Sequence, residues 1–173
     1  AEALGINHVL VRKDLGSIRC SGRPRIGYPT ESLINNLEHF LGFNYTANAV
    51  LVGAGSLGRA LLSYDGFREY GLNIVAAFDI NEKIIGSTIN GKNILSIKDL
   101  MRFCTRLDIK MGIITVPAKS AQDVCDLMIV SDIKAVWNFS PVHLQVPEGV
   151  LVKNENMAYS LSMLSKHLKK SCR

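Results

Sequence analysis

The sequence has 173 residues, of which 47% are hydrophobic, and a net charge of +5 at pH 7. This length is sufficient for one well-buried core and a small second domain. There is no apolar run of about 18 residues, and the four cysteines form no Cys-x-x-Cys pair, so we expect no membrane span, zinc site or disulfide framework. These features favour a metal-free cytoplasmic protein.

Residues 2–15 predict the end of one helix, a turn and a second helix. Gly5 is the expected turn residue, and Asn7 is the expected N-cap because its side chain can accept a hydrogen bond from the first helical turn. A helix-turn-helix of this kind presents its second helix to the major groove of DNA. Arg12 and Lys13 would then lie near base edges or phosphates.

The segment after this pair of helices is basic. Residues 17–27 contain three arginines, two glycines and a proline, which is typical of a basic β-wing and equally of a solvated loop. Positive charge is concentrated at the two ends of the chain, in residues 1–28 and 166–173, whereas the middle is net negative. A phosphate-rich partner is the natural candidate for at least one of these basic ends.

The next segment, residues 30–42, predicts an amphipathic helix. Apolar residues recur at helical spacing from Leu33 to Phe40, and Gly42 is suited to the left-handed conformation that ends many helices. A polar connecting segment follows, and we place a domain boundary there. Residues 1–42 are therefore predicted to form a partial DNA-binding domain.

A glycine-rich turn between a predicted strand and a predicted helix dominates the middle of the chain. The apolar run 49–52 is followed by Gly53, Gly55 and Gly58. In dinucleotide-binding proteins the first glycine permits the turn, the second lets the backbone approach a pyrophosphate, and the third lets the helix pack against the strand. The helix start offers free N–H groups to the phosphates. This order of features predicts a dinucleotide site.

An acidic residue follows at the spacing that this motif requires. Residues 72–79 form a second apolar run that ends in Asp79, 21 residues after Gly58. A carboxylate at this position accepts a hydrogen bond from a ribose 2′-hydroxyl and repels a 2′-phosphate. The sequence therefore favours NAD(H) over NADP(H).

The rest of the chain alternates buried strands with helices, which is typical of a doubly wound parallel α/β sheet, or Rossmann fold, over residues 43–153. Strands are expected at residues 93–95, 111–117, 134–137 and 150–152, and helices at 96–107 and 120–130. Ligands in such sheets lie beyond the carboxyl ends of the strands. Those ends are residues 53–58, Asp79, 115–118 and 138–141.

The last segment, residues 154–173, predicts a helix with an apolar stripe formed by Met157, Leu161, Leu164 and Leu168. The stripe could pack back on its own domain. It fits a contact between two subunits equally well.

The motifs taken together resemble those of the redox-sensing transcriptional repressor Rex family, in the same order and at the same spacing. The resemblance extends from Leu4 to about Val152. The matching segments are residues 4–7, 11–15, 27–28, 50–62, 75–79, 114–118, 138–142 and 146–150.

This resemblance implies a homodimer in which a winged-helix domain binds double-stranded operator DNA and a Rossmann domain binds NADH or NAD⁺. It also implies release of the operator when NADH binds, and a C-terminal helix that is exchanged between subunits. The implied cofactor-binding residues are Gly53, Gly55, Ser56, Leu57, Gly58, Asp79, Ile80, Thr115, Val116, Pro117, Asn138, Phe139, Ser140 and Pro141. The implied DNA-binding residues are His8, Arg12, Lys13, Ser17, Arg19, Arg23 and Arg25. The implied residues of dimer formation and coupling are Asn156, Met157, Leu161 and Leu164.

The sequence departs from the family pattern in three places. The family's winged helix has one or two further helices before the point where this sequence begins, so we expect a partial domain. Leu10 stands where family members often have a polar residue, and the wing lacks the usual Ser-Tyr-Phe-Gly run. Asn156 and Met157 replace an acidic and an aromatic residue at the coupling positions.

Two alternatives belong to other functional classes. An NAD-dependent dehydrogenase would need a substrate domain and a catalytic acid or base, and the sequence offers no Ser-x-x-x-Lys or Tyr-x-x-x-Lys pair in its nucleotide-binding half. A coenzyme A-binding domain of a metabolic enzyme would use the same glycine turn, but it would not need Asp79 or a helix-turn-helix. We therefore expect a repressor without catalytic residues.

Overall fold

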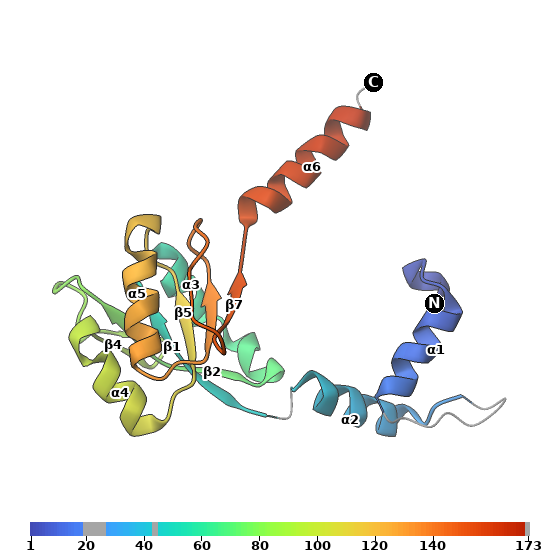
Figure 1. Ribbon diagram of the computed structural model, residues 1–173, viewed down its shortest axis with the longest axis horizontal. Coiled ribbons are helices and arrows are strands. Elements are labelled where there is room, and N and C mark those ends of the chain that lie inside the picture. Colours follow the sequence, from blue (N-terminus) through green and yellow to red (C-terminus); the bar gives the residue numbers. More distant parts are fainter. Residues whose placement is uncertain (19–26, 43–44, 172–173) are drawn as a thin grey trace. The chain divides into compact units, whose positions relative to one another are not determined.

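The computed structural model describes residues 1–18, 27–42 and 45–171 (Figure 1). These residues divide into two compact units. The first unit comprises Ala1–Thr46 and Arg68–Gly71, and the second comprises Ala47–Phe67 and Leu72–Arg173. We describe each unit separately.

The first unit contains a short 3-10 helix, η1 (Glu2–Leu4), and two α-helices, α1 (His8–Ser17) and α2 (Thr30–Leu41). Gly5 follows η1 with a φ of 60°. Asn7 precedes α1, and its Oδ1 accepts a hydrogen bond of 2.8 Å from the backbone N–H of Val9. The predicted turn and N-cap are therefore confirmed.

Helix α2 ends as its sequence predicts. Gly42 has a φ of 76°, and its backbone N–H donates to the carbonyl oxygens of Glu38 and His39. Neither α1 nor α2 has a fully buried residue in the described part of the chain. The predicted β-wing falls largely on residues 19–26, which lie outside the described residues.

The second unit is built on a seven-stranded sheet in the order β3-β4-β2-β1-β5-β6-β7. Every neighbouring pair is parallel except β3 and β4. The predicted doubly wound parallel sheet is confirmed. Its strands are β1 (Ala47–Val52), β2 (Leu72–Asp79), β3 (Thr88–Ile89), β4 (Lys92–Ser96), β5 (Met111–Ile114), β6 (Ala135–Asn138) and β7 (Leu151–Asn154).

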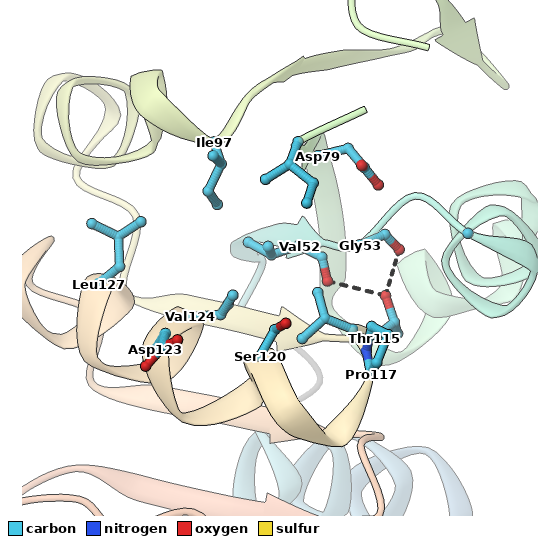
Figure 2. A pocket seen from close by; sticks show the side chains of 13 residues that line it. Val52, Gly53, Asp79, Ile97, Thr115, Pro117, Ser120, Asp123, Val124 and Leu127 are labelled. Carbon is cyan, nitrogen blue, oxygen red and sulfur yellow. Dashed lines mark hydrogen bonds between the residues drawn. The ribbon is translucent and has the colours of Figure 1, made fainter. Parts of the chain in front are cut away.

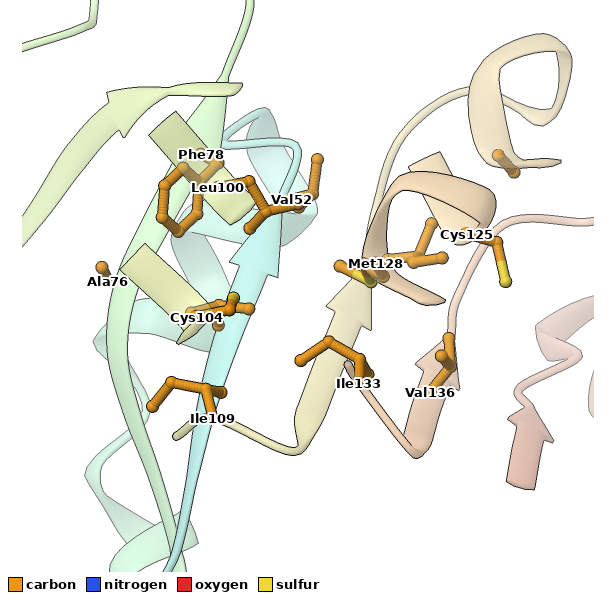
Figure 3. Close-up of a cluster of buried hydrophobic side chains, with 13 residues drawn as sticks. Val52, Ala76, Phe78, Leu100, Cys104, Ile109, Cys125, Met128, Ile133 and Val136 are labelled. Carbon is orange, nitrogen blue, oxygen red and sulfur yellow. The ribbon is translucent and has the colours of Figure 1, made fainter. Parts of the chain in front are cut away.

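Helices cover both faces of this sheet, which explains why its central strands are apolar on both sides. On one face, Val50 and Val52 pack with side chains of α4 and α5 (Figure 3). On the other face, Ala49 and Leu51 pack with Leu62 of α3. The helices of this unit are α3 (Ser56–Ser63), η3 (Ile97–Asp99), α4 (Leu100–Leu107), α5 (Ala118–Val130) and α6 (Met157–Ser171). The 3-10 helix η2 (Asp65–Tyr70) begins in this unit, and its last residues belong to the first unit.

The structure differs from the sequence prediction at two points. The predicted strand 111–117 ends at Ile114, and Pro117 is the N-cap of α5, so only Thr115 and Val116 separate the strand from the start of the helix. A hairpin of β3 and β4 was not predicted. Its two turn residues, Asn90 and Gly91, have φ values of 47° and 72°. Asn-Gly is the preferred sequence for such turns, so the signal was present.

No helix in the described ranges is long and apolar enough to cross a membrane.

Candidate functional site

A pocket of about 470 Å³ opens where β1, β2 and β5 end (Figure 2). The chain runs from β1 to β2 and β4 on one side and returns to β5 and β6 on the other, so the pocket lies at the point where strand order reverses. Ligands of doubly wound sheets bind at this crevice. The lining residues are Val52, Gly53, Gly55, Asp79, Ile80, Ile97, Thr115, Val116, Pro117, Ser120, Asp123, Val124 and Leu127.

The glycine turn at the pocket is tightly packed at two of its three glycines. Gly53 has a φ of 103°, and a Cβ there would lie 2.9 Å from the carbonyl group of Thr115. A Cβ on Gly58 would lie 2.0 Å from the carbonyl oxygen of Gly53. Any larger residue at these positions would therefore displace the backbone that shapes the pocket.

Gly55 differs from the other two glycines because a Cβ there would meet no atom within 4 Å. Gly55 is the N-cap of α3, and no side chain caps the N-terminus of this helix. The first N–H groups of α3 therefore have no side-chain cap, and the turn beside them is open at Gly55. A helix start of this kind binds anions, and a glycine leaves room for a phosphate to approach.

Asp79 is held in place by two backbone hydrogen bonds. Its Oδ2 accepts from the N–H of Ala54 at 2.8 Å, and its Oδ1 accepts from the N–H of Asn81 at 2.9 Å. The first bond ties the end of β2 to the glycine turn after β1. The carboxylate is therefore fixed at the pocket wall, as recognition of a diol requires.

Thr115 closes the wall on the other side of β1. Its hydroxyl donates to the carbonyl oxygen of Gly53 at 2.7 Å and lies 3.1 Å from that of Val52. Its backbone N–H donates to Val52 as well, at 2.9 Å. These contacts join the ends of β1 and β5, and the dashed lines in Figure 2 join the hydroxyl to its two carbonyl neighbours.

Helix α5 contributes a wall that the sequence analysis missed. Ser120, Asp123, Val124 and Leu127 all line the pocket and recur at the i, i+3, i+4, i+7 spacing of one helix face. Ile97 of η3 also lines it. The helical spacing was visible in the sequence, but nothing in it showed which face of α5 meets the pocket.

Several predicted cofactor residues do not line the pocket. Asn138 is fully buried, and its amide nitrogen donates to the carbonyl of Val142 and to Oδ1 of Asn154, both at 2.8 Å. The Ser140 hydroxyl donates to the Val116 carbonyl at 2.5 Å. The Asn138 side chain therefore holds the loop after β6 to β7, and the Ser140 side chain holds this loop against the pocket wall. The predicted residues outside the lining are Ser56, Leu57, Gly58, Asn138, Phe139, Ser140 and Pro141.

The predicted DNA-binding residues lie on α1 and in the segment after it. His8, Arg12, Lys13 and Ser17 are all exposed. At 100° per residue, Lys13 and Ser17 lie opposite the half-buried Val11 and Leu15, whereas Arg12 and His8 flank that buried side. Arg19, Arg23 and Arg25 lie outside the described residues.

Helix α6 exposes most of its apolar stripe. Leu161, Leu164 and Leu168 are each 64% exposed. Asn156 is the residue before the helix, and its Oδ1 accepts from the N–H of Tyr159 at 2.9 Å, so it acts as an N-cap. The side chain of Met157 lies outside the described part.

Charged side chains form a cluster where β5 and β6 begin, at the sheet edge opposite the pocket. Lys110 pairs with Asp108 and Asp132, and Lys134 pairs with Asp132 at 2.6 Å. Hydrogen bonds from Lys110 and Lys134 lower the pKa of Asp132 to about 2, and hydrogen bonds to Asp108 and Asp132 raise the pKa of Lys110. These pairs are solvent-exposed and join two strand starts.

The described cysteines, Cys104 and Cys125, are buried, and their thiols are expected to be unreactive. Burial raises the pKa of the Cys104 thiol to about 11 and also raises that of Cys125. Thiols with raised pKa values are poor nucleophiles. Among the described residues, no three His, Cys, Asp or Glu side chains are grouped so that they could hold a metal ion.

Comparison with known proteins identifies the family. The model of the "CoA binding domain" family matches residues 44–142. The redox-sensing transcriptional repressor Rex of Porphyromonas gingivalis is 41% identical over 169 residues, which cover 98% of this chain and 78% of that protein. The Rex protein of Bacteroides thetaiotaomicron is 40% identical over 97% of this chain and 76% of its own length. The chain belongs to the Rex family.

Solved Rex structures agree with this assignment. A crystal structure of RSP, a Rex-family repressor, in complex with NAD⁺ and operator DNA matches 98% of this chain and 78% of the RSP chain, with a TM-score of 0.93 and 34% identity. RSP in complex with NADH matches with a TM-score of 0.87. These Rex relatives are named repressors and not enzymes, as the sequence analysis expected.

Proposed function

We propose that this chain is a transcriptional repressor that senses the NADH/NAD⁺ ratio and binds operator DNA. The observation that supports this most is the pocket, in which a glycine turn, the uncapped start of α3 and a fixed Asp79 converge. RSP, which shares this fold, has been crystallised with NADH and with NAD⁺ and operator DNA. Such a repressor acts on the chromosome, so we place it in the cytoplasm.

Each part of the pocket has a role in holding the dinucleotide. The free N–H groups at the start of α3 would bind the pyrophosphate next to Gly55. Arg59 of α3 donates from Nε to the carbonyl of Ala54 at 3.2 Å, which keeps a positive charge beside the same turn. Asp79 would accept from the ribose hydroxyls and exclude a 2′-phosphate.

The DNA contacts would come from α1 and the basic segment after it. In a helix-turn-helix the second helix enters the major groove, and exposed cations on it contact phosphates or base edges. Arg12 and Lys13 are exposed on α1 and suit this role. The wing arginines Arg19, Arg23 and Arg25 would add phosphate contacts, because positive charge supplies most of the affinity for DNA.

Dimer formation would use α6. Its three exposed leucines recur at i, i+3 and i+7, which is the pattern of a helix that packs against another helix. A twofold dimer would place two copies of α1 on adjacent turns of a palindromic operator. We therefore propose a homodimer, with Asn156 and Met157 between the nucleotide domain and the paired helices.

Regulation then depends on a difference in affinity. A ligand shifts an equilibrium between two arrangements only if it binds one of them more tightly. The reduced nicotinamide ring is uncharged, whereas the oxidised ring is positive, so an apolar interface between subunits would favour NADH. The NADH-bound arrangement would have the wrong half-site spacing, and the operator would be released.

Calorimetric titration of the purified chain with NADH, NAD⁺, NADPH and coenzyme A tests this proposal. We expect tight NADH binding, weaker NAD⁺ binding and no measurable NADPH binding. Coenzyme A is included because the matching family model describes a coenzyme A-binding domain. Binding of coenzyme A alone would contradict the repressor function, and equal affinities for NADH and NAD⁺ would contradict redox sensing.

A further inference from the structure

One end of the pocket combines an apolar slot with an unused carboxylate. Ile97 lies on one side of this end, and Val124 and Leu127 of α5 lie on the other (Figure 2). Ile80 also lines the pocket. Asp123 belongs to the same face of α5, one residue before Val124. Figure 2 shows Asp79 and Asp123 on opposite sides of the pocket. A base that enters this slot from a sugar bound at Asp79 would approach Asp123.

The carboxylate of Asp123 is free to accept a hydrogen bond from a ligand. No hydrogen bond or ion pair joins it to another residue within the described ranges, although it lines the pocket. Two other acids differ from it in this respect. Asp79 accepts two backbone hydrogen bonds, and Asp126, on the same helix but outside the lining, accepts from Gln122 at 2.8 Å.

The shape of the slot determines which ligand groups can reach the carboxylate of Asp123. Branched apolar side chains on two sides suit the faces of a flat aromatic ring, which leaves only the ring's edge for polar contacts. A carboxylate accepts hydrogen bonds and donates none. It therefore favours a base that presents a donor at that edge and disfavours one that presents an acceptor.

We propose that Asp123 selects adenine at the purine end of the dinucleotide by accepting a hydrogen bond from the 6-amino group. This inference rests on the proposed binding of NADH. A 6-oxo purine presents an acceptor at the same position, and it can offer its ring N1–H to Asp123 only after shifting in the slot. Asp123 thereby makes the pocket sensitive to the base as well as to the ribose and the phosphates.

The test compares NADH with reduced nicotinamide hypoxanthine dinucleotide, which has an oxo group in place of the 6-amino group and a proton on the ring N1. We expect the hypoxanthine analogue to bind the unmodified chain about tenfold more weakly, since one hydrogen bond to a charged group at a solvent-accessible site is lost. Calorimetric titration at one salt concentration measures both dissociation constants.

Two variants assign this preference to the carboxylate. Asp123→Asn supplies an amide that can donate as well as accept, so we expect the two ligands to bind with similar affinity. Asp126→Asn is the matched control, because it makes the same charge change on the same helix outside the pocket, and we expect it to keep the tenfold preference. Asp123 is exposed, so the Asn variant should melt at the temperature of the unmodified chain.

Two kinds of result would overturn the proposal. Equal binding of both ligands by the unmodified chain, or an unchanged preference in Asp123→Asn, would show that Asp123 does not read the base. Failure of the unmodified chain to bind NADH at all would instead refute the proposed function, and the inference would fall with it. The first outcome leaves NADH binding intact, so the two failures are distinguishable.

Discussion

At the scale of single residues, the pocket is defined by a few backbone positions that tolerate almost no change. Gly53 and Gly58 leave no space for a Cβ, whereas Gly55 leaves open space. Asp79 is fixed by two N–H donors. The same short stretch thus contains residues that maintain the fold and residues that remain available to a ligand, and substitutions can separate the two roles.

Substitutions at Gly58 and Gly55 should separate the effect on the fold from the effect on ligand binding. We expect Gly58→Ala to lower the free energy of unfolding by about 1–3 kcal/mol, because its Cβ would overlap the Gly53 carbonyl oxygen. Gly55→Ala should keep its stability and lose at least about tenfold in NADH affinity, since its φ of −73° suits alanine and its Cβ would occupy the phosphate position. Urea denaturation and NADH titration measure the two effects. Loss of stability in Gly55→Ala with unchanged affinity would contradict this assignment.

Asp79 determines the choice between NADH and NADPH in our proposal. Asp79→Asn removes the charge that repels a 2′-phosphate, so we expect weaker NADH binding and a higher affinity for NADPH. The dissociation constant of NADPH divided by that of NADH, both measured by titration, should fall about tenfold or more. If Asp79 had a purely structural role, the substitution would weaken the binding of both ligands equally and leave this ratio unchanged.

At the scale of elements, the connection between β6 and β7 contains no helix within the described part of the chain, so side chains hold it in place. Asn138 bonds the loop and β7, and the backbone N–H of Glu155 donates to the Asn138 carbonyl at 2.8 Å. The indole N–H of Trp137 donates to Glu155 at 3.0 Å. This network joins the pocket wall, through Ser140, to the residues just before α6.

Removal of the Asn138 amide should therefore destabilise the second unit. We expect Asn138→Ala to cost about 3 kcal/mol, because it leaves buried polar groups without partners and creates a small cavity. Trp137→Phe removes one partly exposed hydrogen bond and should cost about 1 kcal/mol. Denaturant unfolding of both variants tests this order of effects. A larger loss for Trp137→Phe than for Asn138→Ala would refute it.

The charged cluster that joins the starts of β5 and β6 predicts a dependence on pH. The pKa of Asp132 falls from its ordinary 3.8 to about 2 in the folded chain. The contribution of Asp132 to the free energy of unfolding is therefore fully present above about pH 4 and is lost as the pH falls toward 2. We expect the free energy of unfolding of Asp132→Asn to fall less between pH 4 and pH 2.5 than that of the unmodified chain, and to change with pH in the same way above pH 5. Urea unfolding at pH 2.5, 4 and 6 measures these free energies. An identical fall between pH 4 and pH 2.5 in both proteins would disprove the assignment.

At the scale of the whole molecule, the two compact units and the exposed stripe of α6 point to function as an assembly. The pocket and α1 belong to different units. A signal between them needs two arrangements that the ligand distinguishes, and a dimer interface provides a surface that can repack. The exposed leucines of α6 are where such an interface can be tested directly.

Substitution in the stripe should produce monomers. We expect the double variant Leu161→Asp/Leu164→Asp to shift the chain from dimer to monomer, because burying two carboxylates between helices is unfavourable. Ser162→Asp, outside the leucine stripe of α6, is the control and should stay dimeric. Sedimentation equilibrium distinguishes the two states. A dimeric double variant would show that α6 is not the contact.

Much of the nucleotide site was predictable because its motif is local. The strand, the glycine turn, the helix and Asp79 follow one another in the sequence, and each is dictated by backbone geometry or by short-range propensity. The Asn90–Gly91 turn was equally local and was overlooked. The contact of Asn138 with the cofactor stays a prediction, and the buried network of its side chain depends on a residue of β7 that is distant in the sequence.

The sequence by itself determined the Rossmann sheet, the position of the glycine turn, the acid at the end of β2 and the helix that follows β7. Each of these depends on residues close together in the chain. Only the tertiary structure decided that Ser120, Asp123, Val124 and Leu127 form a wall of the pocket, and that Asn138 and Ser140 support this wall without lining it. Helical periodicity shows which residues share a face, but packing against the sheet sets the rotation of the helix and so decides which face meets the ligand.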